Sequence, residues 1–105
     1  MTVFWSRGAY ERVGEFRESE SLCMDYEYWL RLAQLADPVF VSYHLANFRV
    51  YQSTKSSTRF VEQFRREYML ARESAAGRHR LLLACHRVMA EMTILAYRLL
   101  RIFGV

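Results

Sequence analysis

The sequence is poor in the residues that usually mark metal sites, disulfides and chain breaks. Its 105 residues include two cysteines, one proline and four glycines. Cys23 and Cys85 stand alone, without a CxxC pair or a histidine at metal-ligand spacing, so the pattern favours neither a zinc site nor a disulfide framework. We therefore expect reduced thiols in a cytoplasmic protein.

Long apolar runs are also absent. The longest stretch without a charged residue, 38–48, contains His44 and is far shorter than the roughly 20 apolar residues of a membrane-spanning helix. Arg7, Glu11 and Arg12 interrupt the region where a secretory signal would need a continuous apolar block. We expect neither a membrane span nor export.

Aspartate is scarce, and positive charge is concentrated at one end. Asp25 and Asp37 are the only aspartates, so the sequence has no DxD metal-binding motif. Residues 1–77 carry ten basic and ten acidic side chains, whereas 78–105 carry five arginines against Glu91 alone. The basic residues of this last segment form one narrow stripe without interleaved aromatic residues, which argues against a nucleic-acid partner.

What remains is a composition typical of a globular chain, with 52% apolar and 25% charged residues. A chain of roughly 100 residues can bury a single core. Glycines, the proline and apolar periodicity predict three or four helices. Their expected ranges are a short helix over 8–13 closed by Gly14, a second from Asp25 toward Asp37 and Pro38, a long one from about Arg59 to Gly77, and a last one over 80–103.

Between the second and third helices, residues 39–41 and 45–50 are rich in β-branched and aromatic side chains without a helical stripe. This pattern favours one or two strands. The expected fold class is therefore α+β and mainly helical, with a short β-segment and long C-terminal helices. We divide the chain into 1–77 and a C-terminal amphipathic basic helix, 78–105.

Two acids, Asp25 and Glu27, share the predicted start of the second helix, among aromatic neighbours. A carboxylate there can cap the helix by accepting N–H bonds from its first turn. Alternatively, a carboxylate beside an aromatic wall can act as a general base toward a hydroxyl. Spacing does not decide between the two. Trp5 and Trp29 likewise can fill the core or stack on a sugar.

An ordered series of segments in residues 2–70 resembles the acceptor-side half of family 2 glycosyltransferases. The most specific segment runs from Asp25 to Ala33, an acidic helix start of the type DY(D/E)xWLRLA. The other matching segments are residues 2–7, then Tyr10, Glu11, Val13, Gly14 and Phe16, then Leu45, Ala46, Phe48 and Arg49, and finally Lys55 and Ser56.

The resemblance implies the acceptor-side half of an α/β fold and an inverting transfer of sugar from a nucleotide-sugar to an acceptor hydroxyl. Asp25 would be the catalytic base. Glu27, a second acid, would contact substrate together with Trp29, Arg49, Lys55 and Ser56. Tyr51 stands where the family often has a histidine, which puts a metal or diphosphate contact at that position in doubt.

The donor-binding strands and the DxD motif of such an enzyme have no counterpart in these residues. We therefore expect no cofactor in this chain, Mg²⁺ or Mn²⁺ in a complete enzyme, and no activity from the chain alone. The nucleotide-sugar and the acceptor would be ligands of the complete enzyme.

A different class of function is a non-catalytic helical interaction module, which the C-terminal helix suggests. Apolar side chains cover a wide arc of residues 80–103 off the arginine stripe. We expect this arc to pack against a second copy of the chain as a homo-oligomer. Peripheral contact with an anionic membrane, at its inner face, is the competing prediction. The apolar arc comprises Leu81, Leu82, Cys85, Val88, Met89, Met92, Leu95, Ala96, Leu99, Leu100 and Phe103.

Overall fold

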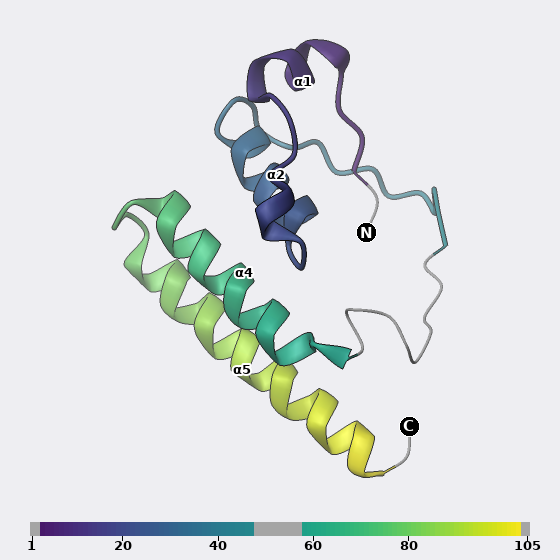
Figure 1. The fold of residues 1–105 in the computed structure, drawn as a ribbon, viewed down its shortest axis with the longest axis vertical. Helices are drawn as coiled ribbons and strands as arrows, with labels where there is room; N and C mark the ends of the chain where they lie inside the picture. Colours follow the sequence, from purple (N-terminus) through teal and green to yellow (C-terminus); the bar gives the residue numbers. More distant parts are fainter. Residues whose placement is uncertain (1–2, 48–57, 104–105) are drawn as a thin grey trace.

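A computed structural model describes residues 3–47 and 58–103 as a set of packed helices (Figure 1). The mainly helical class predicted from the sequence is confirmed. In chain order the elements are α1 (Arg7–Val13), the short 3₁₀ helix η1 (Glu18–Glu20), α2 (Met24–Ala33), α4 (Phe60–Ala75) and α5 (Arg80–Ile102).

The first helix has clear start and stop signals. The Ser6 hydroxyl accepts the backbone N–H of Ala9 at 3.2 Å, which satisfies one of the free donors of the first turn. At the other end Gly14 takes a φ of 84°, and its N–H donates to the carbonyl of Tyr10. A side chain at that φ would be strained, so the predicted closure of this helix by glycine is confirmed.

The second helix begins one residue before Asp25, at Met24, and ends at Ala33, four residues before Asp37. Its N-cap residue is Cys23, whose side chain makes no capping hydrogen bond. Gln34 closes the helix by donating its N–H to the carbonyls of Arg31 and Leu32. The predicted helix is therefore present but shorter at its C-terminal end.

The predicted β-segment is wrong for the residues that the structure describes. Residues 39–47 contain no strand; they run as a single extended segment beside α1 and α2 (Figure 1). A strand requires a neighbour that pairs with its backbone N–H and C=O groups, and these residues have none in the described part of the chain. β-branched composition alone cannot supply that partner. Residues 48–50 of the predicted segment lie outside the described residues.

The two long helices α4 and α5, both predicted from apolar periodicity, form an antiparallel hairpin (Figure 1). The turn between them includes three residues with positive φ: Ala76 at 45°, Gly77 at 80° and His79 at 59°. The boundary drawn between 1–77 and 78–105 falls in this turn, and α5 packs directly on α4.

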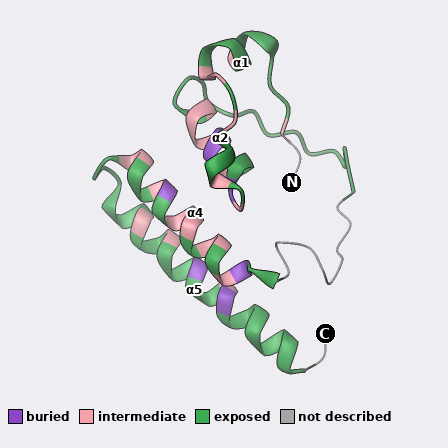
Figure 2. Ribbon diagram, in the orientation of Figure 1, coloured by how far each residue is buried: buried purple, intermediate pink, exposed green. Residues whose placement is uncertain are grey.

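A small core forms where α2 packs beside α1 and on α4, and where α4 meets α5. Its buried apolar members are Cys23, Tyr28, Phe60, Leu70, Ala90 and Ile94. Figure 2 shows short buried stretches on α2, α4 and α5, whereas most of α5 is exposed. No described helix combines the length and apolarity needed to cross a bilayer.

We expect Leu70→Ala to destabilise the protein by about 2–5 kcal/mol, because it removes a buried side chain and leaves a cavity. Leu70 is only 6% exposed. Chemical denaturation followed by far-UV circular dichroism measures the change. The matched control is Leu45→Ala, at a position 53% exposed, where we expect a change within about 0.5 kcal/mol. Equal losses in both variants would contradict this placement of the core.

Candidate functional site

The structure places three of the predicted site residues, Asp25, Glu27 and Trp29, on α2, with Glu27 on a different side from Asp25. Asp25 and Glu27 are two residues apart, a rotation of about 200° on a helix, so their carboxylates point to different sides. Asp25 is exposed, Glu27 is buried and Trp29 is half-buried. The other three predicted substrate contacts, Arg49, Lys55 and Ser56, lie outside the described residues.

Glu27 forms a buried ion pair with Arg31, one helical turn later. Its side chain is 4% exposed, and its Oε1 lies 2.8 Å from Nε of Arg31. Arg17 adds a second guanidinium, with Nη1 3.2 Å from the same oxygen. Arg31 also donates to the carbonyls of Val13 at 2.9 Å and Glu15 at 2.8 Å. The pair therefore ties α2 to the segment that follows α1.

Asp25 has a different environment. It lies in the first turn of α2, where its Oδ1 accepts the N–H of Tyr26 at 2.9 Å. No described basic side chain forms an ion pair with it, so its carboxylate is open to solvent. A carboxylate in this turn interacts favourably with the helix dipole. The geometry is compatible with both the stabilising role and the general-base role that the sequence left open.

Three helices meet beside Asp25 and form what we call the three-helix junction: Asp25 and Tyr26 of α2, Glu67 and Tyr68 of α4, and His86 of α5. The His86 ring centroid lies 6.4 Å from that of Tyr26 and 5.9 Å from that of Tyr68. Burial raises the pKa of Glu67, and the charge of Asp25 adds to this effect. The junction thus places a second acid and an imidazole near the exposed carboxylate.

Cys23 lies under this junction and is not suited to nucleophilic chemistry. It is fully buried, and its thiol donates to the carbonyl of Gln63 on α4 at 3.4 Å. Burial, followed by the negative charges of Glu67 and Asp25, raises the pKa of this thiol to about 12. Since the thiolate is the reactive form, Cys23 acts here as a packed core residue.

Trp29 opens onto an apolar groove of about 1480 Å³ between α1, α2 and residues 37–46. Asp25 is one helical turn from Trp29, so the two side chains are neighbours on the surface of α2. Trp5 also lines the groove, but its ring packs on Tyr28 at 5.3 Å and on Phe16 at 6.1 Å. Trp5 therefore contributes to packing, and both tryptophans line a groove that a ligand could enter.

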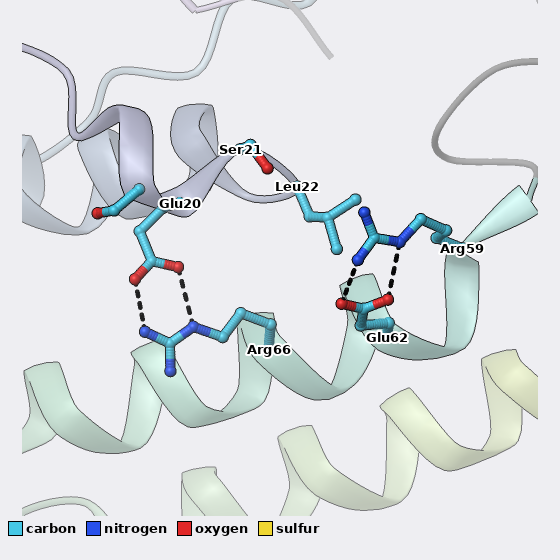
Figure 3. A pocket seen from close by; sticks show the side chains of 7 residues that line it. Glu20, Ser21, Leu22, Arg59, Glu62 and Arg66 are labelled. Atoms are coloured by element: carbon cyan, nitrogen blue, oxygen red, sulfur yellow. Dashed lines mark hydrogen bonds and ion pairs between the residues drawn. The ribbon is translucent and has the colours of Figure 1, made fainter.

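A second, polar pocket of about 270 Å³ lies between η1 and the start of α4 (Figure 3). Its two arginines are both neutralised within the pocket. Arg66 makes a bidentate pair with Glu20 at 2.6 and 2.9 Å, and Arg59 pairs with Glu62. Because these hydrogen bonds occupy the guanidinium groups, the pocket offers no ready site for a diphosphate. The Arg66 contact also lowers the pKa of Glu20.

The described residues do not provide a donor set for the divalent ion that the resemblance implies. Across 3–47 and 58–103, no three His, Cys, Asp or Glu side chains gather in a way that could hold a metal ion.

Comparison with known proteins adds no relative. No family model matches the chain, and neither the curated proteins nor the solved structures contain a match.

Sequence reasoning missed Glu67, Tyr68 and His86 as members of the junction. In the sequence His86 has no cysteine or histidine partner at metal-ligand spacing, so the pattern does not single it out. A signal was nevertheless present: a hairpin that turns near Gly77 brings positions 67 and 86 opposite one another.

We expect Glu27→Gln to cost about 3–5 kcal/mol, since it leaves the guanidinium of Arg31 partly buried without its counter-charge. Urea denaturation measures the loss. Glu11→Gln is the matched control, because Glu11 forms an exposed pair with Arg7 at the same i,i+4 spacing, worth less than about 1 kcal/mol. Similar losses in the two variants would exclude the anchoring role of Glu27.

The two cysteines should differ sharply in reactivity. At pH 8, in protein dilute enough to be monomeric, we expect a thiol reagent such as dithiobis-nitrobenzoate to modify Cys85, which is exposed in the single chain, and to leave Cys23 unmodified. Unfolding in guanidinium should release the second thiol. The measurement is the absorbance of released thionitrobenzoate before and after unfolding. Rapid labelling of both thiols in the native protein would contradict the burial of Cys23.

Proposed function

We propose that this chain is the acceptor-side part of an inverting glycosyltransferase, with Asp25 as its general base. The observation that carries the proposal is the difference in burial and ion pairing between the two acids at the start of α2. Glu27 is buried and engaged by two arginines, whereas Asp25 is exposed, without a described cationic partner, one turn from Trp29. This supports the residue that the family resemblance assigns to catalysis.

In the proposed reaction the Asp25 carboxylate accepts the proton of an acceptor hydroxyl as its oxygen bonds to the anomeric carbon of a nucleotide-sugar. The bond from that carbon to the diphosphate breaks, and the nucleoside diphosphate leaves. Such a base must be accessible and ionised, and it must lie beside a surface that positions the acceptor. The apolar groove next to Trp29 would supply this surface. Glu27 would act through the fold, by fixing the rotation of α2.

The donor-binding half and its divalent ion would come from residues other than the described helices, and Arg49, Lys55 and Ser56 remain proposed substrate contacts. The wall of the groove fits such an arrangement. Val39 and Phe40 are 89% and 88% exposed. Exposing two adjacent apolar side chains to water is unfavourable, which supports the proposal that another segment covers them.

The second candidate function is a non-catalytic helical interaction module. It is favoured by the exposed apolar face of α5, where Leu81, Val88 and Met92 are each more than half exposed. The two functions involve different surfaces, so one chain could carry both.

We expect Asp25→Asn to reduce turnover about 10²- to 10⁴-fold in a complete enzyme that contains this chain, because the variant cannot accept the proton. Release of nucleoside diphosphate from a panel of nucleotide-sugars measures turnover. The chain alone should be inactive in the same assay.

Glu11→Gln is the control, since Glu11 is an exposed acid of α1 that does not line the groove. The melting temperature of both variants should stay close to that of the parent, because asparagine is also tolerated at helix starts. Full turnover by Asp25→Asn would remove the catalytic role and leave Asp25 as a helix-stabilising residue.

A further inference from the structure

The helix α5 has a second apolar face, which packs against no other described helix. We call it the outer seam of α5, and its members succeed one another at alternating spacings of four and three residues. All of them are exposed. The outer seam comprises Leu81, Cys85, Val88, Met92, Leu95, Leu99 and Ile102.

The outer seam lies on the opposite side of α5 from α4. Ala90 and Ile94 are the buried residues of α5 and face the hairpin interior. Each residue advances the helix by about 100°, which places the outer seam roughly half a turn away from these two positions. Figure 2 shows α5 exposed along most of its length. A partner can therefore approach the seam without displacing α4.

The spacing itself indicates the kind of partner. A strict repeat of 3.5 residues over three heptads is the pattern of a coiled coil, in which another helix inserts its side chains between these residues. Adsorption to a lipid surface needs an apolar face but no such repeat. It is also favoured by basic residues on both flanks, whereas the arginines lie on one flank only.

We propose that the outer seam binds the outer seam of a second copy of this chain, with the two α5 helices antiparallel and a two-fold axis passing between Thr93 and Ile94. In this register Met92 lies opposite the partner's Leu95, and Cys85 lies opposite the partner's Ile102. Leu99 lies opposite the partner's Val88. Every seam residue from 85 to 102 then meets an apolar partner.

The residues beside the seam fit the same register. Glu91 and Arg98 flank it on one side, and antiparallel pairing places Glu91 of each copy opposite the partner's Arg98. Glu91 also lies 3.7 Å from Arg65 of α4, but both side chains are more than half exposed, so this contact leaves the carboxylate accessible.

On the other flank the antiparallel register brings Leu82 opposite the partner's Phe103 and Met89 opposite the partner's Ala96. These pairs extend the apolar contact. A parallel pair would instead place Glu91 opposite the partner's Ala96 and Arg98 opposite the partner's Phe103, which leaves both charges unmatched. Charge complementarity thus selects the antiparallel arrangement.

Disulfide formation tests the register directly. In the antiparallel dimer the two Cys85 residues are 17 positions apart along the helix axis, about 25 Å, so oxidation should not link them. Ile102→Cys should form two disulfides with the partner's Cys85 and give a covalent dimer on non-reducing gels. Adding Cys85→Ala to that variant should abolish the product. Leu99→Cys, which faces the partner's Val88, is the matched control.

Sedimentation velocity tests the association itself. We expect the chain to be dimeric at micromolar concentration, and Leu95→Arg to make it monomeric without loss of helical circular dichroism. Met69→Arg, at an exposed position of α4, should remain dimeric. Glu91→Arg and Arg98→Glu should each weaken the dimer about tenfold or more, and the double exchange should restore it.

Three results would overturn the proposal. One is a monomeric parent chain at these concentrations. Another is rapid Cys85 cross-linking in the parent chain, which would indicate a parallel pair. The third is a monomer that cosediments with phosphatidylglycerol vesicles and loses this binding in Leu95→Arg, which would assign the outer seam to a membrane surface.

Discussion

The buried contact between Glu27 and Arg31 is the interaction on which the N-terminal half depends. A buried ion pair contributes little net stability compared with apolar packing, but it strongly disfavours arrangements that leave either charge unpaired. Here it fixes the rotation of α2, because only one rotation brings Glu27 to Arg17 and Arg31 to the carbonyl groups that lie outside the helix. Arg31 extends this constraint through the carbonyls of Val13 and Glu15 and lies 5.0 Å from the Tyr28 ring centroid.

The exposure of Asp25 is a consequence of this constraint. Once Glu27 is buried, a residue two positions earlier must point to the other side of the helix. The catalytic proposal for Asp25 therefore depends on a neighbour that would not itself touch substrate. The acidic run Asp25–Glu27 thus combines a structural anchor and an accessible carboxylate in one turn.

Helices could be predicted well from this sequence because their signals are local. Gly14 and Gly77 mark ends that need a positive φ, and the periodicity of 80–103 reflects one continuous helix. The predicted strands failed because pairing is not local: residues 39–47 have strand composition but no described neighbour. Strand propensity mainly reflects packing against such a neighbour.

The candidate site shows the same difference between local features, which the sequence predicts, and contacts between distant segments, which it does not. Asp25 could be recognised from the sequence as a candidate site residue, because it lies at a predicted helix start among aromatic residues. The burial of Glu27 could not, because Arg17 reaches it through a turn whose path the sequence does not reveal. Glu67 and His86 come together only because α4 and α5 fold back on each other, so a linear search for ligand spacing does not find them.

The contacts between the N-terminal half and the hairpin span long stretches of chain, which has a consequence for the order of folding. Cys23 meets Gln63 across 40 residues and Glu20 meets Arg66 across 46. Closing such a loop costs about 3 kcal/mol of chain entropy, whereas the hairpin closes over a short turn. Helices with local contacts also form faster than distant pairings. We therefore expect α4 and α5 to assemble first, with α2 docking afterwards as a separate and less stable cooperative unit.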